Sequence, residues 1–224
     1  LEMWQAETFD VGTINEELGW AENLGFNVMR VYLHHMAWKQ DPEGFKDRMN
    51  TYLDVAHTHG IKTLFVFFDD CWRDTAWVGS QPRQKPFLHN SAWVQDPPRY
   101  MRADTTTMYP ILEEYMKDVL KEFRKDDRIA GWDLYNEPGN SGYKNTSLPL
   151  LKKAFTWARE VNPSQPLTAG IWSRVMRPIN GYLIQESDII SYHNYSILAN
   201  HSHEIDTLAV YNRPMICTEY MART

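Results

Sequence analysis

Continuous apolar runs alternate with amphipathic segments along most of the chain. Apolar runs predict buried strands at residues 27–33, 61–68, 129–135, 166–172, 188–195 and 214–220. Because apolar residues fill these runs without alternation, the pattern is typical of parallel strands covered on both faces. Apolar residues at helical spacing predict helices at residues 13–25, 41–60, 111–125, 147–161, 180–186 and 204–211. Thr13, with Glu16 three residues later, predicts a capping box at the first helix.

The regular order of strand, helix and strand predicts an α/β fold built with right-handed crossovers. A chain of 224 residues can form one substantial core but not two ordinary domains, so we expect a single domain over residues 1–224. We interpret it as a (β/α)8 TIM barrel that is incomplete at both ends, because a full barrel needs about 250 residues. Strand one would be reduced to residues 1–4, and strand eight would be missing. A doubly wound open sheet is the alternative.

Composition and charge exclude several classes of protein. The chain is 43% hydrophobic, which excludes a disordered protein, and its net charge of −6 provides no basic surface for nucleic acid. No apolar run reaches the roughly 18 residues of a membrane span. The first ten residues contain no signal peptide. The compartment is therefore not determined, although we favour a secreted or periplasmic protein over a cytoplasmic one.

One predicted loop is much longer than the others. Residues 69–109 show no convincing helix or strand pattern, and compact domains rarely contain such a loop unless it has a function. Cys71 lies in this loop and Cys217 in the last predicted strand, on the opposite side of the barrel, so we expect free thiols.

Two glutamates end predicted strands and carry the main chemical signal. Glu137 follows the third run in an Asn-Glu-Pro turn, and Glu219 ends the last run. The carboxyl ends of barrel strands meet at one mouth, so the two side chains should face the same cavity. A single glutamate at a strand end is usually a cap or an ion-pair partner. Two in one mouth can divide the work of a glycosidase, one as a proton donor and the other as a nucleophile.

The segments around these glutamates resemble a known group of enzymes. "WDLYNEP" (132–138) resembles the acid/base motif of clan A glycoside hydrolases, and "ICTEY" (216–220) resembles their nucleophile strand. The cellulase and mannanase group of family five is the most similar. The resemblance implies a retaining hydrolase of β-1,4-glucan, mannan or xylan, or of their oligosaccharides, without cofactor or metal. It makes Glu137 the acid/base, Glu219 the nucleophile and Asn136 a donor to the sugar 2-hydroxyl, with the two carboxyls about 5–5.5 Å apart.

Three further residues have both a structural and a functional interpretation. Arg30 lies inside an apolar strand, where a charge needs a partner. It forms either a structural ion pair or, as the resemblance implies, a contact that keeps the nucleophile ionised. His193 and Tyr195 end the fifth run. Either they are core residues, or one of them orients the nucleophile or the sugar.

The remaining candidates would border a sugar-binding groove. Asp69 and Asp70 end the second run and would either bind sugar hydroxyls or cap the long loop. Trp72, Trp93 and Trp172 lie where such a groove would be, and the indole ring of Trp172 could stack on a sugar. His34 and His35 follow the first run, and we expect no metal there because no acidic ligand lies at metal-binding spacing.

The missing eighth strand leaves a second function open. In clan A enzymes that strand supplies a tryptophan under the reactive sugar, and this chain has no counterpart. The alternative is therefore a carbohydrate-binding barrel that has lost turnover. A phosphate-using isomerase would need a glycine-rich phosphate loop late in the chain, and the sequence has none. Unpaired edge strands also predict self-association through the open barrel edge.

Overall fold

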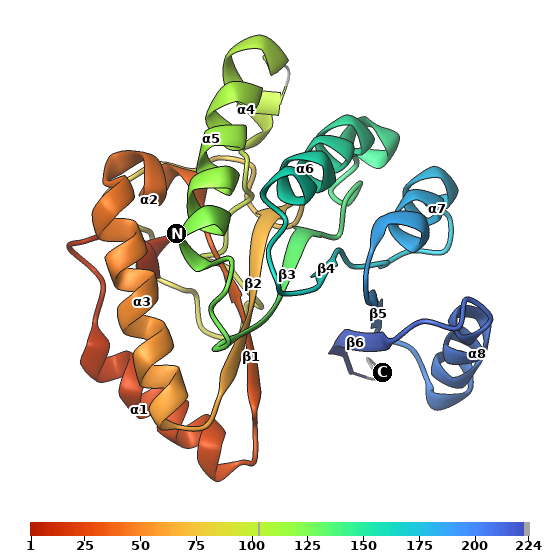
Figure 1. The fold of residues 1–224 in the computed structure, drawn as a ribbon, viewed down its shortest axis with the longest axis horizontal. Helices are drawn as coiled ribbons and strands as arrows, with labels where there is room; N and C mark the ends of the chain where they lie inside the picture. The colour runs from red at the N-terminus through yellow and green to blue at the C-terminus, as the bar shows by residue number, and fades with distance from the viewer. Residues whose placement is uncertain (103, 222–224) are drawn as a thin grey trace.

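The computed structural model describes residues 1–102 and 104–221 and contains six parallel strands surrounded by helices (Figure 1). The strands are β1 (Val28–Tyr32), β2 (Lys62–Asp69), β3 (Ile129–Asn136), β4 (Leu167–Thr168), β5 (Ile190–Asn194) and β6 (Met215–Tyr220). All six lie within the runs predicted from the sequence or extend them by one residue. The prediction of an α/β fold is confirmed.

The strands follow one another in chain order. One sheet has the order β1-β2-β3-β4 and the second pairs β5 with β6, and every pair is parallel. A single bridge between Ile171 and Tyr192 links the two sheets into one arc. A doubly wound sheet would reverse its strand order at a switch point. The unbroken order instead matches an incomplete barrel, so the doubly wound alternative is wrong.

Helices form the outer layer of this arc (Figure 1). The structure contains η1 (Glu2–Trp4), α1 (Val11–Asn23), α2 (His35–Gln40), α3 (Pro42–Thr58), α4 (Arg99–Arg102), α5 (Thr105–Phe123), η2 (Lys144–Ser147), α6 (Leu148–Val161), α7 (Arg177–Glu186) and α8 (Leu198–Ala209). Aromatic side chains fill the space between the helices and β2 and β3. Trp132 stacks against Phe65 and Phe67 at centroid distances of 5.7 and 5.4 Å, and all three are fully buried. This packing keeps the carboxyl ends of β2 and β3 in fixed positions.

The first helix begins earlier than the capping box predicts. Asp10 is the N-cap of α1, and its Oδ1 accepts from the backbone N–H groups of Gly12 and Thr13. Thr13 lies inside the helix and donates its hydroxyl to Asp10 at 2.8 Å. The predicted Thr13 cap is therefore wrong. Because the Asp10 carboxylate satisfies two orphan N–H groups at this end, the helix starts directly after it.

The sequence also missed several short elements. Residues 1–4 contain a 3-10 helix rather than the end of a strand. The long loop contains the short helix α4. Helix α5 starts at Thr105 instead of residue 111, because Asp104 caps it by accepting from the backbone N–H of Thr107. Pro110 is accommodated inside α5 at the loss of one backbone hydrogen bond. The segment without regular structure is therefore shorter than expected.

The fourth strand is shorter than its apolar run. β4 covers two residues of the predicted 166–172. Gly170 follows it, and a Cβ at this position would lie 2.7 Å from Nε2 of His193. The chain bends away from regular pairing here, and the missing side chain makes room for the His193 ring.

The two ends of the arc remain open within the described part of the chain. Among its six strands, β1 pairs only with β2, and β6 pairs only with β5. Such edges expose unpaired backbone groups, and self-association through them stays a prediction. None of the described helices is long and apolar enough to cross a membrane.

Candidate active site

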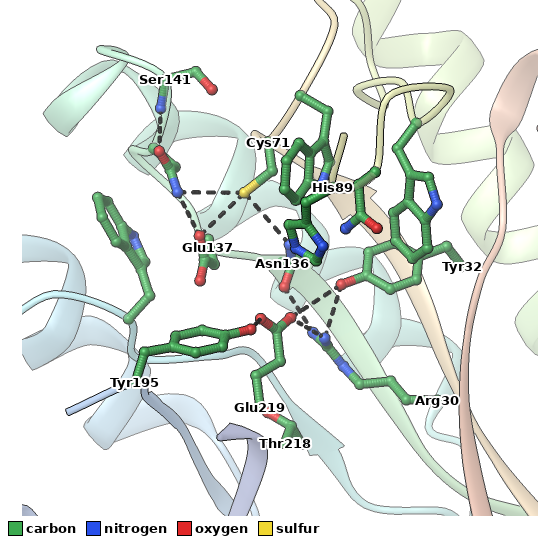
Figure 2. A pocket seen from close by; sticks show the side chains of 15 residues that line it. Arg30, Tyr32, Cys71, His89, Asn136, Glu137, Ser141, Tyr195, Thr218 and Glu219 are labelled. Carbon is green, nitrogen blue, oxygen red and sulfur yellow. Dashed lines mark hydrogen bonds and ion pairs between the residues drawn. The ribbon is translucent and has the colours of Figure 1, made fainter. Parts of the chain in front are cut away.

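A pocket of about 710 Å³ lies at the carboxyl ends of the strands and contains both glutamates (Figure 2). Glu137 directly follows β3, and Glu219 lies in β6. One carboxyl oxygen of each lies within 4.8 Å of the other and of Nδ1 of His193. Residues 82 positions apart in the sequence thus face one cavity, as their positions at strand ends predict.

Donors from three sides hold the carboxyl group of Glu137. Nδ1 of His193 lies 2.7 Å from Oε1, while Oε2 contacts the Cys71 thiol at 3.1 Å and the side-chain amide of Asn140. Burial raises the pKa of Glu137, but the hydrogen bonds and the charge of His193 outweigh it, so the net pKa lies below its ordinary value. The backbone of Glu137 has φ +45°, an uncommon conformation for a residue with a side chain. This turn aims the carboxyl group into the pocket.

A different set of donors holds Glu219. Nη1 of Arg30 lies 2.6 Å from Oε1, and the hydroxyl of Tyr32 lies 3.3 Å from the same oxygen. The hydroxyl of Tyr195 donates to Oε2 at 2.6 Å. His193 is farther away, with Nδ1 at 3.6 Å from Oε2. Of the two residues that end the fifth run, Tyr195 therefore contacts the predicted nucleophile, and His193 contacts the predicted acid.

Arg30 contacts two carboxylates, so it forms the structural ion pair that was one of its two predicted roles, while its effect on the nucleophile stays a prediction. Besides Glu219, it forms a close ion pair with Asp133, with Nε and Nη2 at 3.0 and 2.6 Å from Oδ2. Nη2 also donates to Oδ1 of Asn136 at 2.8 Å. Asp133 is fully buried in β3. One guanidinium thus joins a buried carboxylate to the carboxylate of Glu219 across the pocket.

Asn136 is oriented by its neighbours. Its oxygen accepts from Arg30, so its Nδ2 faces Asp69, to which it donates at 2.8 Å. Burial raises the pKa of Asp69 to about 8, against the hydrogen bonds from Asn136 and from the backbone N–H of Cys71. Asp69 supports the amide of Asn136 and does not line the pocket that contains the glutamates.

Asp70 has a structural position, contrary to one of its two predicted roles. It is fully buried and forms an ion pair with Arg102 at 2.5 Å. It also accepts from the hydroxyls of Tyr135 and Ser147 and from the backbone N–H of Gly139. With its oxygens occupied, Asp70 cannot contact a sugar. It ties α4 and the loop after β3 to the end of β2.

Aromatic side chains form the walls of the pocket. Trp72, Trp93 and Trp172 all line it, and the ring of Trp93 packs edge-on against Tyr32 at a centroid distance of 5.0 Å. Trp72 is about one third exposed and has φ +73°, which turns its ring toward the pocket. Trp172 donates from Nε1 to the backbone oxygen of Pro138 at 3.0 Å, which fixes its ring beside Glu137.

His34 and His35 have an acidic partner that the sequence did not reveal. Asp96 from the long loop contacts Nδ1 of His35 and lies 3.9 Å from Nδ1 of His34, and all three side chains are buried. These three residues could hold a metal by residue type. However, His34 already uses both ring nitrogens, with Met36 N and the oxygen of Gln95. The cluster therefore anchors the long loop to the end of β1.

Several residues of the site were missing from the sequence-based prediction: Tyr32, Cys71, Asn140 and Asp133. Asp133 had a detectable signal, because an acidic residue inside an apolar run needs a basic partner, and Arg30 lies inside another such run. The others come from loops or from an edge strand, where no periodicity marks them.

Comparisons with known proteins agree with this geometry. The family profile for Cellulase (glycosyl hydrolase family 5) matches residues 6–220. No curated protein sequence matches the chain.

Solved structures share the fold at low sequence identity. An endo-1,4-β-mannanase from Rhizomucor miehei is 14% identical, with a TM-score of 0.69 over 98% of this chain and 75% of its own. The β-mannanase of the blue mussel Mytilus edulis is 16% identical, with a TM-score of 0.52 over 88% of this chain and 67% of its own. GH5_18 from Streptomyces cattleya in complex with GlcNAc is 15% identical, with a TM-score of 0.59 over 90% of this chain.

This chain spans 49% of the Streptomyces protein, about half its length. The family profile, in contrast, covers nearly all of the chain and includes both glutamates and their strands. On that match, the chain belongs to glycosyl hydrolase family 5, the cellulase family.

Proposed function

We propose that this protein hydrolyses β-glycosidic bonds with retention of configuration, using Glu137 as acid and base and Glu219 as nucleophile. The proposal is carried by one observation: an oxygen of each carboxyl lies within 4.8 Å of the other in a single pocket. Retaining glycosidases keep their two carboxyls about 5–5.5 Å apart, whereas inverting ones leave room for a water between them.

The two carboxyls are suited to different steps. Arg30 and Tyr195 donate hydrogen bonds to Glu219 and would hold its carboxylate in position to attack the anomeric carbon. Glu137 would give its proton to the glycosidic oxygen as that bond breaks, leaving a glycosyl ester on Glu219. Glu137 would then take a proton from the water that cleaves the ester. Asn136 lines the same pocket and is the candidate donor to the sugar 2-hydroxyl, which would take the place of the long 3.6 Å contact between its Nδ2 and the sulfur of Cys71.

Aromatic walls support a carbohydrate substrate. The rings of Trp72, Trp93 and Trp172 border the pocket and present flat apolar faces of the kind that stack on pyranose rings. Family membership and the neighbouring mannanases support a β-1,4-linked polysaccharide or oligosaccharide of the glucan, mannan or xylan class. No cofactor is required by this mechanism.

A panel of aryl β-glycosides tests the activity directly. The chain is incubated with aryl β-glucoside, β-mannoside, β-xyloside and β-cellobioside, and aglycone release is followed by absorbance. Proton NMR of the first sugar product should show the β-anomer. Formation of the α-anomer would indicate inversion and contradict the assignment.

A nucleophile variant separates an enzyme from a carbohydrate-binding barrel. Glu219→Ala should abolish turnover, and added azide should restore cleavage of an activated substrate with an α-glycosyl azide as product. Equal aglycone release by the wild-type chain and by Glu219→Ala would rule out this nucleophile. Sugar binding without aglycone release by the wild-type chain would support the binding function instead.

A further inference from the structure

Cys71 contacts the acid–base half of the site in a way that the proposed mechanism does not use. It directly follows the buried end of β2, and its side chain lines the pocket (Figure 2). Its sulfur lies 3.1 Å from Oε2 of Glu137, 3.3 Å from the amide nitrogen of Asn140 and 3.6 Å from that of Asn136. The thiol is thus surrounded by polar groups of the site.

The direction of these hydrogen bonds follows from the chemistry of the partners. Amide nitrogens can only donate, so Asn136 and Asn140 present hydrogens to the sulfur. Burial raises the pKa of the Cys71 thiol, and the charges of Asp69 and Glu137 act in the same direction, so the thiol keeps its hydrogen. Two carboxyls lie near the thiol: Oε2 of Glu137 is at 3.1 Å from the sulfur, whereas Asp69 already accepts on Oδ1 from the Asn136 amide and from the Cys71 backbone N–H. The S–H group therefore points to Oε2.

The two oxygens of Glu137 are consequently unequal. Oε2 accepts from the Cys71 thiol and from the Asn140 amide, which occupies both of its lone-pair directions. Among the described residues, Oε1 has one hydrogen-bond contact, with Nδ1 of His193 at 2.7 Å, and keeps one direction open. His193 Nδ1 also lies 3.6 Å from Glu219, so Oε1 is the oxygen on the nucleophile side.

We propose that Cys71 is a positioning residue whose S–H donates to Oε2 of Glu137 and thereby confines the acid's proton to Oε1. A proton on Oε2 would have to displace one of two donors, whereas Oε1 can take it without losing a contact. The proton would then be presented where the glycosidic oxygen has to lie, beside the attacking carboxylate. This inference rests on the proposed role of Glu137 as acid and base.

The titration of Glu137 tests the thiol without requiring turnover. The chain is labelled with 13C at glutamate side-chain carboxyls, and the Glu137 signal is assigned by its loss in Glu137→Gln. A donor to the ionised form lowers an acid's pKa, so Cys71→Ala should raise the pKa of Glu137 by about 0.5–1 pH unit. Cys71→Ser keeps a donor and should return the value toward that of the wild type.

Cys217 provides the matched control, because it is the other cysteine and its sulfur contacts the backbone oxygen of Glu219 instead. Cys217→Ala should leave the titration of Glu137 unchanged. If Cys71→Ala does not fold, Cys71→Val fills more of the same space without a donor and should give the same rise. An unchanged Glu137 pKa after loss of the S–H, or an equal rise in Cys217→Ala, would overturn the proposal.

Kinetics then distinguish this inference from the proposed function. In an active chain, the alkaline limb of the kcat/KM profile should move to higher pH in Cys71→Ala by the same amount as the NMR value. A shifted NMR titration in a chain without turnover would reject the hydrolase and retain the thiol contact. Turnover in a chain whose Glu137 titration does not shift in Cys71→Ala would reject the thiol contact and retain the hydrolase.

Discussion

The two ends of the strand arc hold their glutamates by different means. β2 and β3 are buried along nearly their whole length, and Glu137, whose side chain is 12% exposed, follows β3. β6 is half-buried or exposed at every position and has a single neighbour among the described strands, β5. The side chain of Glu219 is 22% exposed. Packing therefore fixes Glu137 more firmly than Glu219.

Because β6 is less well packed than β3, other contacts have to hold Glu219 at its end of the arc. Glu219 is held by Arg30, which lies 189 positions earlier on β1, and by Tyr195 from the loop after β5. These charged and polar contacts replace the packing that a second neighbouring strand would give. Arg30 is itself fixed by the buried Asp133 of β3. The more deeply buried half of the arc thus positions Glu219 through one guanidinium.

The largest expected effect comes from removing the counter-ion of Arg30. Asp133→Ala leaves the guanidinium without its buried partner and should lower the free energy of unfolding by about 3–5 kcal/mol, measured by urea denaturation. Turnover should fall as well, because Arg30 also holds Glu219. Asp74→Ala is the control: its pair with Arg99 is about half exposed and should contribute about 0–1 kcal/mol. Similar losses in both variants would contradict a more deeply buried half organised by this ion pair.

A glycine pair tests the junction between the two sheets. Gly170→Ala would place a Cβ 2.7 Å from the His193 ring, and should cost about 1–3 kcal/mol of stability and displace His193 from Glu137. Gly181 lies inside α7, and a methyl group added there would meet no described atom within 4 Å. Gly181→Ala should therefore stabilise the fold by about 0.5–1 kcal/mol. Thermal unfolding of both variants measures this, and a stabilising Gly170→Ala would argue against the close approach.

Tyr195→Phe sharpens the comparison at the open end. The hydroxyl donates to Glu219 at 2.6 Å from a half-buried position, so its loss should lower kcat about 10-fold, equivalent to about 1.4 kcal/mol. Stability should change by less than about 0.5 kcal/mol. Steady-state kinetics and urea denaturation on the same preparation separate the two effects. A large loss of stability with unchanged kcat would make Tyr195 a packing residue.

Asp69 gives the buried end a pH dependence of its own. Its pKa in the fold, about 8, lies above the ordinary value of 3.8, so the folded state binds the proton more tightly than the unfolded state. The contribution of Asp69 to the free energy of unfolding is fully present at acid pH. It is lost as the pH rises from about 4 through 8. Asp69→Asn should reduce the loss of stability between pH 5 and pH 8 by on the order of 1 kcal/mol. An unchanged pH dependence in urea denaturation would show that Asp69 is already ionised in the fold.

The accuracy of the sequence-based predictions differs between regular elements and the pocket. Apolar runs located all six strands, including β1 and β6, which are not fully buried at any position. Helix starts were less accurate: Asp10 rather than Thr13 caps α1, and Asp104 starts α5 before Pro110. Several side chains can accept from the unpaired N–H groups at the start of a helix. The sequence does not show which side chain reaches those groups.

The sequence by itself determined the parallel order of the strands and the location of Glu137 and Glu219 at strand ends, since both follow from local patterns of burial. Only the tertiary structure decided which donors each carboxylate meets: Tyr195 for Glu219, and His193 and Cys71 for Glu137. It also decided that Asp70 is a structural anchor rather than a sugar ligand. These contacts join residues 24 to 77 positions apart. They depend on side-chain positions that differ by only a few ångströms. These positions arise only once the strands are packed together.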